Sequence, residues 1–330
     1  MLGQLIVSLH TVVITTSIHP MSDYLDAKTA GCYHVPVLLE ESVEALVTDP
    51  SGIYIDATLG GGGHSRHILE HLSEGGHLFG VDRDADAEAN NSIRDPRFTF
   101  VRSDFRYIHR FMDYFGVEAV DGILADLGVS SHHLDAEERG FSFRFDAPID
   151  MRMNRSGGRS AADILRDYSL DDLSRVLREY GEVKGAYRIA QAIVDARDDH
   201  DIKSVGEFLD AIAKVCPPHD KKNLARIFQA LRIEVNDEMG ALESLLVEGS
   251  GLLKPGGRMV IITYHSLEDR PVKNFFRHGN LSGERLTDVY GMPLSHMEPL
   301  TTKPLIPSDM EQEVNPRSRS AKLRVGVRKE

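Results

Sequence analysis

The sequence predicts an α/β protein whose mostly parallel sheet is interrupted by an all-α insertion. From Gly52 to Asp126, short apolar runs alternate with helical stretches, which is the pattern of βαβ units. Between about Ser160 and Val215 the periodicity is helical and no strand is indicated. A continuous apolar run at residues 258–263 then indicates a further buried strand. The sheet is therefore expected to form from two segments of chain separated by helices.

The predicted strands end at or near polar residues, at the edge where ligands bind to such sheets. The first four strands are residues 53–56, 77–82, 98–101 and 122–126. After a helical stretch at 224–253, Pro255-Gly256-Gly257 predicts a turn into the strand at 258–263. The alternating segment 322–328 has a period of two residues and suits an edge or near-edge strand.

The insertion carries two clear helix signals. Apolar residues at Leu173, Val176, Leu177 and Tyr180 follow the i, i+3, i+4, i+7 spacing of an amphipathic helix. Ser204 and Glu207 form a capping box that opens a second helix. The apolar side of that second helix consists of Phe208, Ile212 and Val215.

Length and charge limit the classes of function. The chain has 330 residues and a formal net charge of −13, so two domains are expected and general adhesion to nucleic acid is not. Any RNA site must be local. Two basic stretches stand out, each of which could equally be a solvated surface: Arg139, Arg144, Arg152, Arg155 and Arg159, and Arg317, Arg319, Lys322, Arg324, Arg328 and Lys329.

The two cysteines and the N-terminal residues give little information about the function. Cys32 and Cys216 are far apart and match no metal-ligand spacing, so we expect no disulfide framework, no metal and a reducing cytoplasm. Residues 2–18 are fairly apolar but short for a membrane span and lack a basic start. We therefore expect no membrane association and a disordered extension at residues 1–32, with Met21 as an alternative start.

A glycine-rich loop follows the first predicted strand. Asp56-Ala-Thr-Leu-Gly60-Gly61-Gly62-Gly63-His64 lies between that strand and a helix, where glycines let the backbone turn sharply and approach a ligand closely. Asp82 ends the next strand, 22 residues after Gly60, near the spacing at which an acid accepts hydrogen bonds from ribose hydroxyls. These residues predict an adenosine-containing cofactor, although a plain strand-to-helix turn also explains a glycine run.

The glycine spacing does not separate S-adenosylmethionine from NAD by itself. It is not the G-x-G-x-x-G pattern of dinucleotide enzymes, and polar residues at the ends of the third and fourth strands favour S-adenosylmethionine. Phe105 could stack on the adenine or be a core aromatic residue. Asp126 could contact the cofactor or the nucleophile, or cap the following turn.

Eight ordered segments resemble the motif set of the ribosomal RNA small-subunit methyltransferase H family. The resemblance runs from about Tyr33 to the C-terminus. The segments are His34-Val-Pro-Val-Leu-Leu39, Gly61-Gly-Gly-His-Ser65, Asp126-Leu-Gly-Val-Ser-Ser131, Arg139-Gly-Phe-Ser-Phe143, Ile149-Asp-Met-Arg-Met-Asn154, Phe228-Gln-Ala-Leu-Arg-Ile233, His265-Ser-Leu-Glu-Asp-Arg270 and Asn315-Pro-Arg-Ser-Arg-Ser320.

The resemblance implies a class I (Rossmann-like) S-adenosylmethionine-dependent methyltransferase with a helical insertion. It implies that the product is N4-methylcytidine in the decoding region of 16S rRNA, at position 1402 in the usual numbering. By motif, the cofactor contacts would be Gly61, Gly62, Gly63, His64, Asp82, Phe105, Asp126 and His133. The chain departs from the family at His133, where Gln is common, and in the segment 182–187.

The target base must leave its stack to reach the methyl group, so a pocket must receive it. We place Phe141, Phe143, Asp150, Arg152, Asn154 and His265 around that pocket, and Arg317 and Arg319 on phosphates. Asp126 is the catalytic candidate for polarising the amine. His265 could instead cap a strand end, and the core is the favoured place for Met151 and Met153.

The expected domains are a methyltransferase domain at 33–145 and 223–330, split by a helical substrate-recognition insertion at 146–222. The expected partner is 16S rRNA within the assembling or assembled small ribosomal subunit, with homodimerisation left open. Two other classes stay under consideration: a nicotinamide-dependent dehydrogenase and a noncatalytic ribosome-assembly factor.

Overall fold

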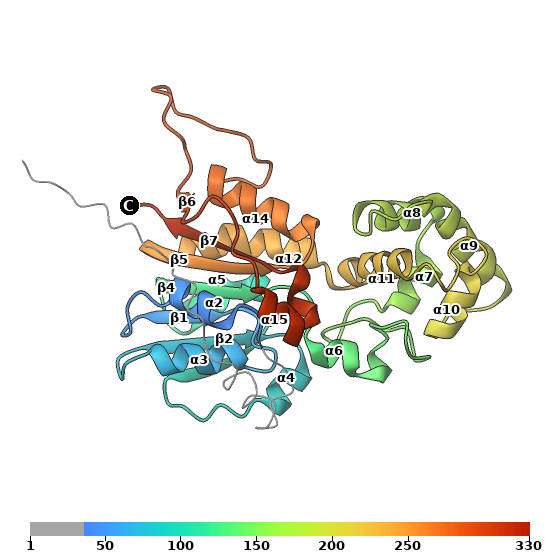
Figure 1. Cartoon of the computed structure of the whole chain (residues 1–330), viewed down its shortest axis with the longest axis horizontal. Coiled ribbons are helices and arrows are strands. Elements are labelled where there is room, and N and C mark those ends of the chain that lie inside the picture. Colours follow the sequence, from blue (N-terminus) through green and yellow to red (C-terminus); the bar gives the residue numbers. More distant parts are fainter. Residues whose placement is uncertain (1–35) are drawn as a thin grey trace, which may run out of the picture. The chain divides into compact units, whose positions relative to one another are not determined.

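Seven strands of the described chain form one sheet. The computed structural model describes residues 36–330, apart from the side chains of residues 131 and 132, so the predicted extension at 1–32 lies outside the described residues. The strands are β1 (Ile53–Asp56), β2 (His77–Asp82), β3 (Phe98–Arg102), β4 (Val120–Asp126), β5 (Leu253–Thr263), β6 (Met297–Pro299) and β7 (Lys322–Arg328). Their order is β3-β2-β1-β4-β5-β7-β6, with β1 to β5 parallel and β7 antiparallel to both neighbours (Figure 1).

Consecutive residues of the central strands enter two different cores, because side chains alternate between the faces of a sheet. In β4, Ile123 packs on the side of α5 and α14, whereas Leu124 packs on the side of α2 and α3. Both faces are covered, which explains why the central strands read as continuous apolar runs. These helices are α2 (Leu39–Leu46), α3 (Gly63–His71), α5 (Ile108–Tyr114) and α14 (Ser266–His278).

Shorter elements connect the strands. Five of them lie at or beside the carboxyl edge of the sheet: α4 (Ala85–Asn90), η1 (Phe105–Tyr107), α6 (Ser131–Asp135), η2 (Glu137–Arg139) and η4 (Pro316–Ser320). The remaining ones are α12 (Glu238–Ser244), η3 (Leu245–Gly249), α13 (Ser250–Leu252) and α15 (Asp309–Val314). No helix within residues 36–330 is long and apolar enough to span a membrane.

The predicted helical insertion has a core of its own. Its helices are α7 (Ala161–Asp167), α8 (Leu170–Glu179), α9 (Ala186–Asp199), α10 (Val205–Ile212) and α11 (Lys221–Asn236). The apolar face predicted for α8 is buried, and the capping box of Ser204 and Glu207 opens α10 as expected. Residues from Phe141 to Leu231 share this core, so the segment that packs together is longer than 146–222. The domain boundaries themselves stay a prediction.

Two local predictions need correction, and one strand was not predicted. The helical stretch expected at 224–253 breaks at Asp237, which has a left-handed backbone (φ 46°). Strand β5 begins at Leu253 and runs through the expected Pro-Gly-Gly turn, with a register irregularity opposite Val120 and Gly122. The short edge strand β6 was not expected, and it places β7 next to the edge.

Candidate active site

The glycine loop after β1 is shaped by backbone that only glycine adopts easily. Gly60 and Gly62 have φ values of 50° and 73°. A Cβ added to Gly63 would clash with Pro36 Cγ, whereas one added to Gly61 would meet no atom of residues 36–330 within 4 Å. Gly63 is therefore required for packing, and Gly61 leaves open space above the loop. That space suits close approach by a ligand.

Asp56 and Thr58 tie the loop to the sheet. The buried carboxylate of Asp56 accepts hydrogen bonds from the Thr58 N–H at 3.1 Å and from the Ser65 hydroxyl at 2.6 Å. Burial raises the pKa of Asp56 despite these bonds and the neighbouring His64. Thr58 Oγ1 in turn accepts the Asp126 N–H at 2.7 Å. The loop and the end of β4 are thus held together.

Asp82 lies directly beside the glycine loop, as predicted. Its carboxylate oxygens accept hydrogen bonds from the Gly60 N–H at 2.9 Å and the Asp84 N–H at 2.8 Å. A carboxylate has about four acceptor sites, so two remain for hydroxyl groups of a ligand. Burial raises the pKa of Asp82 above its usual range. The predicted acid and the predicted loop are brought together.

Asp126 at the end of β4 is paired with a residue that the motif analysis did not select. The Tyr264 hydroxyl donates a hydrogen bond to Asp126 Oδ1 at 2.7 Å. Burial raises the pKa of Asp126 to about 6, although His64 and the Tyr264 hydrogen bond oppose the rise. The pKa of Tyr264 is raised as well, by burial and by the Asp126 charge. The pair provides a carboxylate with one oxygen fixed in place.

His265 is an N-cap in this structure. Its Nδ1 accepts the Glu268 N–H at the start of α14, and Glu268 Oε2 accepts the Tyr264 N–H at 2.9 Å. Burial lowers the pKa of His265 to about 4, with the Arg232 charge contributing, so the ring is neutral near pH 7. Burial raises the pKa of Glu268 to about 7. His265 therefore caps the start of α14 rather than the end of a strand, and its role in substrate binding stays a prediction.

His133 makes contacts on both ring nitrogens. Nε2 lies 2.6 Å from Asp84 Oδ2, and Nδ1 lies 3.0 Å from Ser130 Oγ. Arg139, which is 1% exposed, donates to the same Asp84 oxygen at 3.0 Å. Burial alone would raise the pKa of Asp84, but the hydrogen bonds from His133 and the Asp86 N–H, together with the nearby Arg139 charge, outweigh burial and hold that pKa well below the usual range. His133 as a cofactor ligand stays a prediction, and its observed contact is with Asp84.

Most side chains of the two basic stretches named from the sequence form ion pairs or hydrogen bonds within the protein. Arg139 also pairs with Asp86 at 2.6 Å and donates to backbone carbonyls, so it lies inside the protein rather than on a surface. Arg324 pairs with Asp269 at 2.6 Å, and Arg328 donates to three backbone carbonyls. These cations hold the fold together, because a buried charge must be paired.

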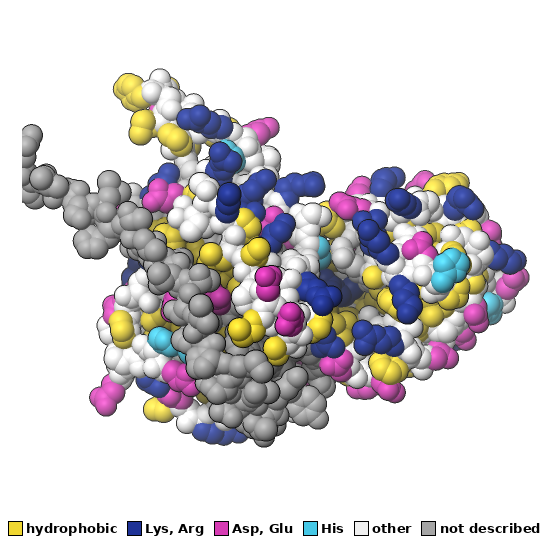
Figure 2. Space-filling view, in the orientation of Figure 1, with side chains coloured by type: hydrophobic (Ala, Val, Ile, Leu, Met, Phe, Trp, Pro, Cys, Tyr) yellow, Lys and Arg dark blue, Asp and Glu magenta, His cyan; other side chains and the backbone are white. Residues whose placement is uncertain are grey.

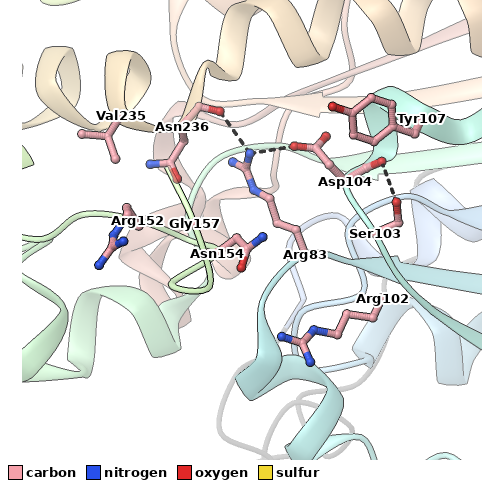
Figure 3. A pocket seen from close by; sticks show the side chains of 10 residues that line it. All are labelled: Arg83, Arg102, Ser103, Asp104, Tyr107, Arg152, Asn154, Gly157, Val235 and Asn236. Carbon is pink, nitrogen blue, oxygen red and sulfur yellow. Dashed lines mark hydrogen bonds and ion pairs between the residues drawn. The ribbon is translucent and has the colours of Figure 1, made fainter. Parts of the chain in front are cut away.

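A cavity of about 370 Å³ lies between β3 and the start of the insertion (Figure 3). Two of the predicted substrate residues, Arg152 and Asn154, line it. Arg83 extends toward Asp104 and Asn236, and it donates to Asp104 at 2.9 Å and to the Asn236 carbonyl at 3.0 Å. Arg152 is held by Asp150 through two hydrogen bonds of 2.7 and 2.9 Å. The positive charges of Arg83 and Arg152 are therefore largely balanced by Asp104 and Asp150.

A second cavity of about 300 Å³ contains two other predicted residues. Its lining includes His265, Arg319, Tyr264 and Ser266. Because Tyr264 also bonds Asp126, this cavity is linked directly to the end of β4. Arg319 is exposed. Asp126 lines neither cavity, but its hydrogen-bond partner Tyr264 lines this one.

The remaining predicted residues lie elsewhere. Phe141 is buried in the insertion core, where its ring centroid lies 5.1 Å from that of His133. Phe143 packs against Phe228 in the same core, at 5.5 Å. Phe105 begins η1 and packs on the sheet core, which leaves both of its predicted interpretations open. Arg317 pairs with Asp135 at 2.7 Å. The predicted residues therefore do not surround a single pocket.

Sequence reasoning missed Tyr264 and Thr58. Both contact Asp126 from neighbouring strand ends, Tyr264 after β5 and Thr58 after β1. Carboxyl ends of parallel strands meet at one edge of a sheet, so every polar residue just after such a strand could have been considered. Within residues 36–330, no group of three or more His, Cys, Asp or Glu side chains has the arrangement of a metal site.

The sheet order, the antiparallel β7, the glycine loop and the acids ending β2 and β4 define a class I, Rossmann-like methyltransferase fold with an inserted helical unit. The chain belongs to the MraW methylase family, whose sequence profile matches residues 31–329.

Curated relatives are similar over most of their length. The ribosomal RNA small subunit methyltransferase H of Parabacteroides distasonis is 54% identical over 89% of this chain and 97% of its own. The protein of that name from Bacteroides thetaiotaomicron is 53% identical over 90% and 98%. A solved rRNA methylase from Streptococcus thermophilus aligns over 90% and 99% of the chains with 12% identity and a TM-score of 0.37, which is too low to support a conclusion.

Proposed function

We propose that this protein transfers a methyl group from S-adenosylmethionine to the N4 amine of a cytidine in the decoding region of 16S rRNA. The curated relatives carry the name ribosomal RNA small subunit methyltransferase H, which supports rRNA of the small subunit as the substrate. The observation that carries the reaction is the Asp126 carboxylate, fixed by Tyr264 at the end of β4 and tied to the glycine loop through Thr58.

The residues around the loop fit S-adenosylmethionine. The open space above Gly61 admits a ligand next to the backbone, and Asp82 retains acceptor sites for ribose hydroxyls. When bound, the sulfonium supplies an activated methyl group. Phe105, three residues after β3, is proposed to face the adenine, and His64 and His133 to complete the site from α3 and α6.

In this reaction the N4 lone pair forms a bond to the methyl carbon as the carbon–sulfur bond breaks, and the sulfur takes the bonding electrons. The methylated nitrogen is then positively charged and must lose a proton. Asp126 is proposed to accept a hydrogen bond from the N4 amine and then that proton. Tyr264 holds Oδ1, so Oδ2 is the oxygen available to the amine.

Nitrogen fits the described site better than a ring carbon does. Carbon methylation of a pyrimidine ring needs a thiolate that adds to the ring before the methyl group is transferred. Cys216 is the cysteine within residues 36–330, and it is buried in the core of the helical insertion. Amine methylation needs no covalent adduct, so an acceptor such as Asp126 is sufficient.

The target base is proposed to enter the cavity lined by Tyr264, His265 and Arg319, because this cavity leads to Asp126. Extruding a base costs a few kcal/mol unless the RNA is already distorted. The remaining residues expected from the resemblance, Arg152 and Asn154 among them, would contact neighbouring nucleotides. The assembled or assembling small subunit in the cytoplasm is the proposed setting.

The test is labelled methyl transfer to small ribosomal subunits from cells that lack the enzyme, followed by nucleoside analysis. We expect label in N4-methylcytidine with the wild-type protein and loss of that label with Asp126→Asn. Label in another nucleoside would overturn the N4 assignment. Wild-type protein that binds the subunits but transfers no label would instead support a noncatalytic assembly factor, and unchanged label with Asp126→Asn would overturn the role of Asp126.

A further inference from the structure

One face of α14 carries cations that the protein does not use. Arg270, Lys273 and Arg277 are spaced by three and four residues, so they share one side of the helix. All three are exposed, and none has a hydrogen-bond or ion-pair partner within residues 36–330. The opposite side of α14 is buried and includes Val272 and Phe275. We call these three residues the α14 basic face.

The acid that precedes Arg270 in the sequence, Asp269, already has basic partners. Asp269 binds Arg324 through two hydrogen bonds of 2.6 and 3.1 Å and lies 3.4 Å from Lys322 Nζ. These contacts lower the pKa of Asp269 against the effect of burial. Its charge is therefore balanced, and the three cations beside it remain unpaired. In a chain with a formal net charge of −13, such a group is a local exception.

The face begins at the proposed base pocket. Ser266 lies one turn before Arg270 on the same side of α14 and lines the cavity that contains Tyr264. With a rise of 1.5 Å per residue, the distance along the helix from Ser266 to Arg277 is about 16 Å. Figure 2 shows Lys and Arg side chains gathered over the region that α14 occupies in Figure 1. The positive charge therefore leads away from the cavity in one direction.

We infer that the α14 basic face binds consecutive phosphates of the RNA strand on one side of the target nucleotide, and this inference rests on the proposed function. Exposed, unpaired Lys and Arg side chains bind phosphates by releasing counterions, and they fix the register of a strand without reading its sequence. A strand held along α14 delivers its nucleotide to the cavity at Ser266. The face thus positions the substrate and takes no part in the chemistry.

The test measures binding of the full-length protein to unmethylated small ribosomal subunits at several salt concentrations. The variant is Arg270→Ala/Lys273→Ala/Arg277→Ala. Each lost phosphate contact should reduce the slope of log K against log salt by about 0.7 to 0.9, so the triple variant should lose about 2 to 3. A second readout, S-adenosylmethionine binding by calorimetry, should be unchanged.

The matched control removes three exposed cations from other surfaces, Arg94→Ala/Arg110→Ala/Lys254→Ala, with the same change in net charge. This control should retain the wild-type slope. Equal slopes in the α14 variant and the wild type, or an equal loss in the control, would overturn the inference. A wild-type protein that binds subunits through the α14 basic face but methylates another nucleoside would leave the inference standing and refute the proposed N4 reaction.

Discussion

The Tyr264 hydroxyl and Asp126 Oδ1 are 2.7 Å apart, at the ends of the adjacent strands β5 and β4. The hydrogen bond leaves Asp126 Oδ2 as the carboxylate oxygen without a hydrogen-bond partner in the described chain. The charged groups that act on Asp126 come from four elements or their ends: Asp56 of β1, His64 of α3, Glu268 of α14 and Glu311 of α15. Tyr264 is therefore a positioning residue for Asp126 in the proposed reaction.

Tyr264→Phe should slow methyl transfer about tenfold while leaving the KM for S-adenosylmethionine nearly unchanged. The carboxylate of Asp126 must be ionised to accept a proton, so activity should fall as the pH drops through its pKa of about 6. The Tyr264 hydrogen bond stabilises the ionised form. Its loss should move the acid limb of the kcat profile upward by about one pH unit. The measurement is kcat against pH for both proteins.

A merely structural Tyr264 would give a different result. In that case Tyr264→Phe would lower the melting temperature or the active fraction, and the acid limb would stay where it is in the wild type. A rise in the KM for S-adenosylmethionine with unchanged kcat would assign the pair to cofactor binding instead. Either outcome would contradict the positioning role.

Gly61→Ala and Gly63→Ala form a matched pair that tests the cofactor loop. A methyl group at Gly63 would collide with Pro36, so we expect a loss of about 1 to 3 kcal/mol in the free energy of unfolding. A methyl group at Gly61 meets no atom of the described residues, so stability should change by less than about 0.5 kcal/mol. Gly61→Ala should nevertheless weaken S-adenosylmethionine binding, measured by calorimetry. Unchanged affinity in Gly61→Ala would show that the cofactor does not approach this loop.

Much of the sheet could be predicted from local pattern, and the contacts between strand ends could not. β1 and β2 match their predicted ranges, since buried parallel strands are short apolar runs followed by polar residues. The strand β6 has three residues and no pattern of its own. Among the site residues, Asp82 and the glycine loop meet as expected, because their spacing is fixed by one βαβ unit.

The predictions that failed concern contacts between residues that are far apart in the sequence. Arg139 reads as part of a basic surface, but its partners Asp84 and Asp86 lie more than 50 residues away. Phe141, in a segment that resembles a family motif, was expected around the base pocket, yet it packs in the insertion core. Which carboxylate pairs with an arginine, and how deeply an aromatic ring is buried, depend on tertiary packing. The residue pattern of one segment does not contain that information.

Asn236→Ala should destabilise the protein by about 2 to 4 kcal/mol. The Asn236 side chain donates to the Met151 carbonyl at 2.7 Å and accepts the Met153 N–H at 2.8 Å, and both bonds are buried. Met151 has a left-handed backbone (φ 60°), which this pair of bonds helps to hold. Chemical denaturation measures the change. Asn154→Ala, on an exposed side chain, is the control and should cost less than about 0.5 kcal/mol.

Glu268→Gln should reduce the pH dependence of stability. Burial raises the pKa of Glu268 to about 7 in the folded protein, above its value in the unfolded chain, so folding favours the protonated form. The associated stability is complete below about pH 4.5 and is lost as the pH rises through about 7, a change of roughly 3 kcal/mol. Glutamine keeps the acceptor for the Tyr264 N–H but cannot ionise.

We therefore expect the wild-type melting temperature to fall between pH 5 and pH 8 and the fall to be several degrees smaller in Glu268→Gln. Part of the fall should remain in the variant, because burial also raises the pKa of Glu311 to about 7. Glu313→Gln, on the exposed side of α15, should retain the full wild-type change. An equal fall in the wild type and in Glu268→Gln would mean that Glu268 is ionised in the folded protein at pH 5, and its hydrogen bonds from Tyr264 and His265 would then outweigh the cost of its burial.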